Sequence, residues 1–456
     1  MRRADAQFPY RIAIVYGLMV VGTVGAFLLV RSYGSTLVAP DSPAPRSSTA
    51  TTHQQPDAIL HLLLALAAVI IVGQVLAKAF AFLSQPPVIG EVVAGILLGP
   101  SLLGREYSEL ILPDSVAPLL AVVAQLGIIL YMFIIGLELN ATLLKERLHT
   151  TIATSHMSIL VPFLLGSLLA LPLYTRLSSK DVEFTSFALF MGVAISITAF
   201  PVLARILTDF GLARSELGVV ALGCAAIDDV TAWCLLAGVS GVARAQVGQG
   251  IWVAAGTLAY ITLMFVAVRP FLRRISSGLK TESLGRGTTA VFIIALLLSA
   301  LVSEFIGIHA AFGAFLLGAV IANDSAVARA FIKQLEAVVT VLFLPAFFAL
   351  TGMRTRIDLV SGVDQWLICG LIILVATVGK FGGSFVAARF TGLGWREAAA
   401  IGTLMNTRGL MELIVLNIGL DLGVISPTLF AMMVLMALVT TMATSPVLRL
   451  LIRPGD

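Results

Sequence analysis

Two adjacent carboxylates, Asp228 and Asp229, interrupt an apolar stretch that runs from about residue 217 to residue 242. One ionised carboxylate at the centre of a bilayer costs roughly 3 kcal/mol on insertion scales, so a pair there indicates a functional site. Neighbouring side chains on a helix point about 100° apart. One carboxylate can therefore line a cavity while the other meets a partner. The alternative is a short polar turn between two helices, but the flanking residues lack Pro-Gly-Asn turn chemistry.

A proline, Pro201, lies inside the preceding apolar segment. It has no backbone N–H, and its ring clashes with the carbonyl four residues earlier, so the helix should break just before it. Freed backbone groups at membrane depth are tolerated where they line a cavity or meet polar partners. A proline kink satisfied by nearby hydroxyls is the alternative. We expect an unwound segment whose oxygens can bind a small hard cation, formed by Ser196, Thr198, Ala199, Phe200 and Pro201.

A second polar interruption, from Asn406 to Gly409, lies in an apolar segment near the C-terminus. Gly409 lowers helix propensity by up to about 1 kcal/mol, and Asn406 and Thr407 can hydrogen-bond to the local backbone instead of continuing a helix. The sequence therefore predicts a second broken helix. Arg408 and Glu412 lie four residues apart and can pair, either as a structural ion pair or as part of a coupling network.

Lys380 lies near the middle of another apolar segment, too deep for its ammonium to reach the membrane surface easily. A buried ammonium pairs with a carboxylate or loses its proton. We favour pairing with the two aspartates over the other acidic residues in predicted spans, which are Glu91, Glu304 and Glu412. Two interrupted helices in separate halves of a chain, with an ionisable site between them, are typical of an inverted-repeat secondary transporter.

The composition around these residues is that of a membrane protein. Of 456 residues, 59% are hydrophobic and 12% are charged, whereas soluble domains have about 25% charged residues. The net charge of +4 leaves no basic patch for nucleic acid. The three cysteines show neither CxxC spacing nor a nearby His pair. We expect packing roles, and neither disulfides nor a zinc site, for Cys224, Cys234 and Cys369.

About fourteen transmembrane helices are predicted from the repeated apolar runs. Their ranges are 12–30, 58–82, 88–100, 117–138, 151–175, 184–207, 216–242, 250–269, 288–307, 309–323, 338–353, 365–390, 397–420 and 426–450. The runs at 88–100 and 309–323 are short for a full crossing. Basic residues concentrate in the loops on the N-terminal side of the membrane, so the positive-inside rule places both termini in the cytoplasm.

The sequence divides into four parts. Residues 1–31 form either a cleaved signal peptide or a retained helix, and we favour a retained helix because no small-x-small cleavage site follows directly. Residues 32–57 are rich in Ser, Thr and Pro and should form a flexible external linker. Residues 58–450 form one transmembrane domain. Residues 451–456 form a short cytoplasmic tail, which leaves no room for a soluble regulatory domain.

Five motifs together resemble the monovalent cation:proton antiporters. In order, they are QPPVIGEVVAGILLGP at 85–100, ITAFP at 197–201, AIDD at 226–229, IHAAFGAF at 308–315 and NTRGLMEL at 406–413. The resemblance covers about residues 58–450. It is closest to the second branch of that superfamily, which includes bacterial sodium/proton and potassium/proton antiporters and plant and fungal cation/proton exchangers.

The resemblance implies an all-α fold with a dimerisation domain and a mobile core domain, in which two unwound helices cross beside the carboxylates. By position, Asp229 resembles the main cation- and proton-binding carboxylate, Asp228 the neighbouring acid and Thr198 a polar group at the first crossing. Lys380 resembles the lysine that pairs with the neighbouring acid in electrogenic antiporters. Glu412 follows the pattern of the cation/proton exchangers, so the resemblance does not choose between Na⁺ and K⁺.

We therefore expect a secondary active antiporter, not an enzyme, that exchanges Na⁺ or K⁺ electrogenically for protons by alternating access. The transported cation would bind at Asp228 and Asp229, and no resident cofactor is expected. The resemblance implies a homodimer in the cell (inner) membrane. A cation channel or uniporter with the same acidic site is the first alternative, and it would not move protons. An intramembrane hydrolase would need two converging carboxylates, which adjacent positions on one helix disfavour.

Overall fold

A computed structural model describes residues 8–41, 58–83, 85–111, 113, 116–138, 148–213, 215–244, 249–277, 285–321 and 325–452. In this part of the chain all regular secondary structure is helical, which confirms the predicted all-α fold. Most of the predicted linker, residues 42–57, and the end of the predicted tail, residues 453–456, lie outside the described residues.

The helices follow the predicted apolar runs. In chain order they are α1 (Phe8–Gly34), α2 (Ala58–Phe82), α3 (Pro87–Leu98), α4 (Arg105–Ile111), α5 (Ala117–Glu138), α6 (Leu148–Leu177), α7 (Phe184–Ser196), α8 (Phe200–Asp209), α9 (Glu216–Arg244), α10 (Gln249–Leu263), η2 (Met264–Val268), α11 (Arg269–Ser277), α12 (Arg286–Ile306), α13 (Ala310–Val320), α14 (Ala326–Val338), η3 (Val339–Phe343), α15 (Leu344–Arg354), η4 (Ile357–Leu359), α16 (Gly362–Phe390), α17 (Trp395–Met405), α18 (Leu410–Asp421) and α19 (Pro427–Leu451).

The number of full membrane crossings differs from the prediction. Among the described residues, 11 helical spans are long and apolar enough to cross a membrane, or 12 if α17 and α18, bent by 41°, count as one span. The predicted count of about fourteen is not confirmed. The two missing crossings are α3 and α13, which have 12 and 11 residues and are short for a hydrocarbon core about 30 Å thick.

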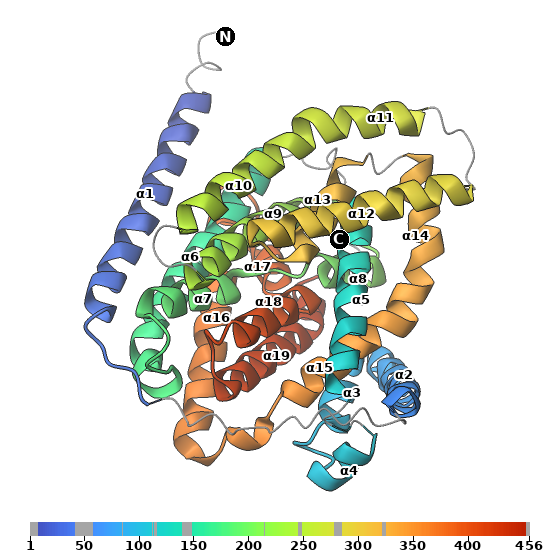
Figure 1. The fold of residues 1–456 in the computed structure, drawn as a ribbon. Helices are drawn as coiled ribbons and strands as arrows, with labels where there is room; N and C mark the ends of the chain where they lie inside the picture. The colour runs from blue at the N-terminus through green and yellow to red at the C-terminus, as the bar shows by residue number, and fades with distance from the viewer. Residues whose placement is uncertain are drawn as a thin grey trace.

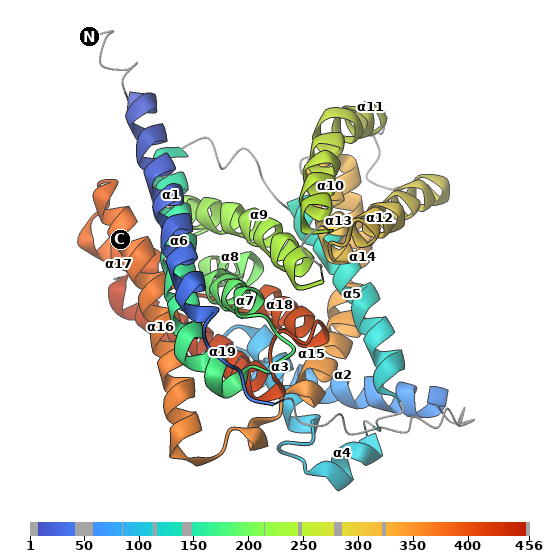
Figure 2. The ribbon, with the colours of Figure 1, turned by 60° about the vertical axis from the view of Figure 1, so that its left-hand side comes forward.

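The helices after α1 form two groups that lie side by side (Figure 2). The first group contains α6 to α9 and α16 to α19, and includes both broken helices. The second contains α2, α3, α5 and α10 to α15, with α10, α11 and α12 arching over one end of the molecule in Figure 1. Helix α9, which carries the two aspartates, contacts members of both groups.

Helix α1 packs on the outside of the first group, against α6 and α7 (Figures 1 and 2). The rings of Phe27 and Phe163 lie 5.8 Å apart. Helix α1 extends to Gly34, past the predicted boundary at residue 31. Ala39 is buried, and the Lys180 N–H donates a 3.1 Å hydrogen bond to Pro40 O. The start of the segment predicted as a flexible linker is therefore packed against the protein.

Candidate functional site

The first broken helix consists of α7 and α8, which are separated by residues 197–199. Ile197 and Ala199 both have extended backbone conformations. Pro201 lies in the first turn of α8, where its missing N–H costs no helical hydrogen bond. The break therefore follows from Pro201 as the sequence predicted, and Thr198 lies at its centre.

The second broken helix consists of α17 and α18, separated by Asn406 to Gly409. The two breaks meet, since the Ala199 N–H donates a 3.0 Å hydrogen bond to Thr407 O and Thr198 Oγ1 lies 3.2 Å from Met405 O. Backbone groups freed by one break are thus satisfied by the other, as an apolar interior requires. This contact forms the predicted crossing of two unwound helices.

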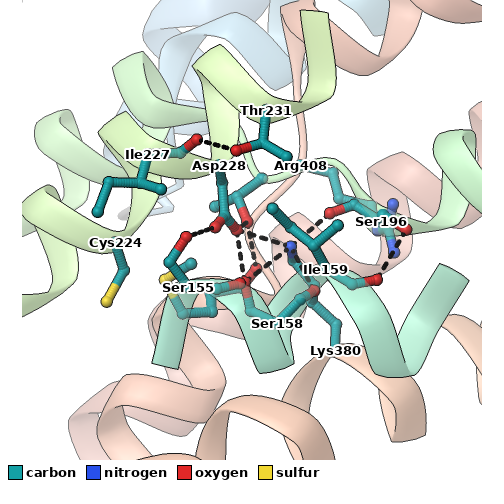
Figure 3. Close-up of polar contacts among 12 residues, drawn as sticks. Ser155, Ser158, Ile159, Ser196, Cys224, Ile227, Asp228, Thr231, Lys380 and Arg408 are labelled. Carbon is teal, nitrogen blue, oxygen red and sulfur yellow. Dashed lines mark hydrogen bonds and ion pairs between the residues drawn. The ribbon is translucent and has the colours of Figure 1, made fainter. Parts of the chain in front are cut away.

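Asp228 is fully buried where α6, α9 and α16 meet (Figure 3). Its Oδ1 accepts a 2.6 Å hydrogen bond from Ser155 Oγ. Its Oδ2 lies 2.6 Å from Ser158 Oγ, 2.9 Å from Thr198 Oγ1 and 3.0 Å from Lys380 Nζ. Four donors therefore engage the two carboxylate oxygens of Asp228, one at Oδ1 and three at Oδ2.

Lys380 is likewise fully buried, with its ammonium surrounded by acceptors. In addition to Asp228, Nζ donates a 2.9 Å hydrogen bond to Ser158 O and another to Ser196 O, at the end of α7. An ammonium has three N–H donors, and all three are used here. The Lys380 ammonium therefore lies at the C-terminal end of α7, where the helix dipole is negative.

Asp229 lies beside this pair but has different surroundings. Its side chain is 1% exposed, and its Oδ1 has no hydrogen-bond partner among the described residues. The backbone N–H of Phe200, the first residue of α8, lies close enough to interact with the carboxylate, and a helix N-terminus favours negative charge. Asp229 thus keeps a free buried acceptor, which can take a proton or a cation.

Arg408 and Glu412 form a second buried ion pair, with Arg408 Nη1 2.7 Å from Glu412 Oε2. The guanidinium also donates to Ala194 O at 3.1 Å and to Ile195 O at 2.6 Å, both in the last turn of α7. No hydrogen bond or ion pair joins Arg408 or Glu412 to the two aspartates among the residues that the structure describes. The pair joins one broken helix to the other.

Sequence reasoning missed three hydroxyl groups at the site. Ser155 and Ser158 lie three residues apart in α6, a spacing that places both on one helix face. Thr441 of α19 holds the second break, because its Oγ1 accepts from Arg408 N at 2.9 Å and donates to Arg408 O at 2.7 Å. The spacing of the two serines within an apolar run was the one signal available for them.

The remaining predicted residues have other positions. Ser196 Oγ donates to Gly192 O of its own helix, so its carbonyl, not its hydroxyl, reaches Lys380. Asn406 Oδ1 is buried without a hydrogen-bond partner among the described residues. Cys224 and Cys369 are buried, but Cys234, expected to be a packing residue, is exposed on this chain. In the described part of the chain, no group of three or more His, Cys, Asp or Glu side chains could hold a metal ion.

Thr441→Val is expected to destabilise the protein by about 1–3 kcal/mol, because it leaves two buried backbone groups of Arg408 without their partner. The change should appear as a lower midpoint of thermal unfolding in detergent. Thr440→Val is the matched control, since the Thr440 hydroxyl donates within its own helix, to Met436 O at 2.9 Å. Equal midpoints for the two variants would contradict the capping role of Thr441.

The chain is similar to known cation/proton antiporters. Residues 59–452 match the family described as "Sodium/hydrogen exchanger, transmembrane". The chain is 42% identical over 394 residues to Na(+)/H(+) antiporter NhaS4 of Synechocystis sp., covering 84% of this chain and 96% of that protein. It is 36% identical over 413 residues to Cation/H(+) antiporter 20 of Arabidopsis thaliana (86% of this chain, 49% of that protein). It is 35% identical over 386 residues to K(+)/H(+) antiporter 1 of Saccharomyces cerevisiae (81% and 45%).

The chain spans about half the length of these plant and yeast relatives. Among solved structures, it is similar to the sodium proton antiporter MjNhaP1 from Methanocaldococcus jannaschii at pH 8, with a TM-score of 0.61 and 16% identity. The alignment covers 86% of this chain and 96% of that one. At this identity, the likeness shows the fold alone.

Proposed function

Because the chain belongs to the transmembrane sodium/hydrogen exchanger family, we propose that it is a secondary active antiporter that exchanges Na⁺ or K⁺ for protons. It is an integral membrane protein and a transporter, not an enzyme. The activities in the names of its relatives are exchange of Na⁺ or K⁺ for H⁺. They do not favour the channel or uniporter alternative.

The observation that carries the proposal is the placement of Asp229 beside the first broken helix, at the start of α8. Its carboxylate has one free buried oxygen, and the N-terminus of α8 faces it. Asp228, whose two oxygens already accept from four donors, is less free to bind a cation. We infer that the cation and a proton compete for Asp229, with Asp228 and the unwound backbone near Thr198 shaping the site. Mutually exclusive binding at one carboxylate couples the two fluxes.

Alternating access requires the two helix groups to move relative to each other, and they meet differently at the two ends of the molecule. At one end, Arg354 of α15 bridges the helix groups, with Nη1 3.0 Å from Asn417 Oδ1 and 2.8 Å from Asp421 Oδ1 of α18. At the other end, a cavity of about 390 Å³ lies between the α2–α3 connection, α8 and the end of α19. We infer that the helix groups are held together at the Asp421 end and leave space between them at the end of α19.

Exchange should be tested in liposomes that contain the purified full-length protein. A pH-sensitive dye inside the vesicles would report proton movement when Na⁺, K⁺ or Li⁺ is added outside, with and without a clamped membrane potential. We expect cation-driven proton movement that depends on the potential. Cation uptake without proton movement would favour a channel and overturn the proposal.

Lys380→Gln is expected to keep exchange but to remove its dependence on membrane potential. We infer that Lys380 releases a proton when the cation binds, so that the wild-type protein moves about two protons per cation; glutamine has no proton to release at this position. The measurement is the initial rate of dye response at a series of clamped potentials. A Lys380→Gln variant with voltage-dependent exchange would contradict this role.

The cellular setting is also part of the proposal. The loop basic residues favour cytoplasmic termini, and the resemblance favours a homodimer in the cell (inner) membrane. We infer a retained N-terminal helix, a linker between it and residue 58, a transmembrane exchange domain over 58–450 and a short tail. Accessibility of a single cysteine at residue 2 or residue 455 to an impermeant thiol reagent in intact cells would test the orientation.

A further inference from the structure

Ser155 and Ser158 bring two hydroxyl groups from α6 to Asp228 (Figure 3). We propose that these serines are positioning residues that set the number of protons exchanged per cation. The inference rests on the proposed function. It concerns the pair formed by Asp228 and Lys380, and not cation binding at Asp229.

The proton that Lys380 loses has two destinations. If it moves to Asp228, the pair keeps it and nothing is released, because the two groups titrate as one unit. If it moves to water on the open side of the membrane, the proton is exchanged. The choice depends on whether Asp228 stays ionised once the ammonium beside it has become a neutral amine.

The hydroxyl groups favour an ionised Asp228. A buried carboxylate that accepts two or three hydrogen bonds is stabilised in its charged form. Without the charge of Lys380, Asp228 still has three hydroxyl donors: Ser155 at 2.6 Å, Ser158 at 2.6 Å and Thr198 at 2.9 Å. Without the two serines, one hydroxyl would remain, and the carboxylate would take the proton from Lys380.

Ser158 contacts both members of the pair. Its carbonyl accepts from Lys380 Nζ at 2.9 Å, while its Oγ lies 2.6 Å from Asp228 Oδ2 and 2.8 Å from Ser155 O. The single hydroxyl proton can therefore point to Asp228 when the carboxylate is ionised, or back to Ser155 O when it is protonated. Ser158 thus responds to the charge of Asp228.

The other titratable groups around the pair are already engaged or belong to the cation site. Cys224 Sγ donates to Thr151 O at 3.3 Å, and His156 Nδ1 lies 2.8 Å from Ile152 O of its own helix. Arg408 and Glu412, which interact electrostatically with Lys380, form a neutral ion pair. The groups left to exchange protons are Asp229, Asp228 and Lys380.

The test is the proton-to-cation ratio of a Ser155→Ala/Ser158→Ala double variant of the full-length protein in liposomes. At zero membrane potential and a fixed pH gradient, the opposing cation gradient that stops dye-reported proton movement gives the ratio. For wild type we expect the balancing cation gradient to be the square of the proton gradient. For the double variant we expect the two gradients to balance when equal.

Ser167→Ala is the matched control, because Ser167 is a buried serine of the same helix whose hydroxyl donates to Ala188 O at 3.3 Å. Its proton movement should stop at the same opposing cation gradient as that of the wild-type protein. The ratio does not depend on how much protein is active, so partial loss of folded protein would not change it. If the double variant shows no exchange, the single variants are measured instead. The proton-to-cation ratio of each should lie between the wild-type ratio and one proton per cation.

Three results separate the possible failures. The inference would be overturned if the double variant, or both single variants, had the wild-type proton-to-cation ratio. A wild-type protein that balances at equal gradients would also overturn it, although exchange itself would stand. A wild-type protein without cation-driven proton movement would instead refute the proposed function.

Discussion

Asp229→Asn is expected to reduce cation-driven proton movement to the level of protein-free liposomes while the protein stays folded. Asparagine has nearly the same shape as aspartate but no titratable proton and no negative charge. Its side chain would stand at the N-terminus of α8, in the place where the Asp229 carboxylate has a free oxygen. Both the cation and the proton would lose their binding group, so no gradient or potential should restore exchange.

The measurement is the dye response to Na⁺, K⁺ and Li⁺, beside the elution profile and thermal unfolding midpoint of the purified variant. Asp364→Asn is the matched control, because Asp364 is exposed and pairs with Arg176 on the surface, and it should exchange as wild type does. Asp228→Asn should keep exchange with one proton fewer per cation. Exchange by a folded Asp229→Asn variant would show that another group binds the cation.

Much of this site could be predicted because charge and broken helices are costly inside a membrane. Asp228 and Lys380 each required a partner within an apolar interior, and the structure places them 3.0 Å apart. Pro201 required a break in its helix, and α8 begins at the residue before it. Where burying a residue in an apolar helix costs much free energy, the sequence alone predicts that a compensating partner or a helix break lies beside it.

The hydroxyl groups could not be assigned in the same way. A serine or threonine in an apolar helix can satisfy itself on a carbonyl of its own helix, as Thr440 and Thr208 do. Apart from the three-residue spacing of Ser155 and Ser158, nothing local separates these residues from Ser155, Ser158 or Thr441, whose hydroxyls reach other elements. Which hydroxyl faces the site depends on how α6 and α19 are rotated in the packed protein, and the chain sequence does not state this.

The predicted count of about fourteen spans is not confirmed, for a related reason. The runs that became α3 and α13 are apolar apart from Glu91 of α3, but apolar composition measures burial and does not separate a crossing from a short helix packed inside the protein. Gly95 illustrates the packing, since a Cβ there would lie 2.1 Å from Phe348 O of α15. Close contacts of this kind bury a short helix without requiring it to reach both membrane surfaces.

Arg408→Met is expected to destabilise the protein by about 3–5 kcal/mol, the usual cost of breaking a buried ion pair by removing one partner. Glu412 is 0% exposed and would be left as a buried acid without a cation. Ala194 O and Ile195 O would also lose their donor at the end of α7. Arg205→Met is the control, because Arg205 pairs with Asp209 on the surface with the same spacing, and exposed pairs contribute about 0–1 kcal/mol.

The double variant Arg408→Met/Glu412→Leu decides between the two roles left open for this pair. Removing both charges together should recover part of the lost stability, because no uncompensated charge then remains in the interior. Thermal unfolding of the four proteins of the cycle gives the interaction energy of the pair. A stable double variant that still exchanges cation for protons would make Arg408 and Glu412 a structural link between α7 and α18. A stable double variant without exchange would place the pair in the coupling between the broken helices, since its contacts at α7 adjoin the carbonyl that holds Lys380.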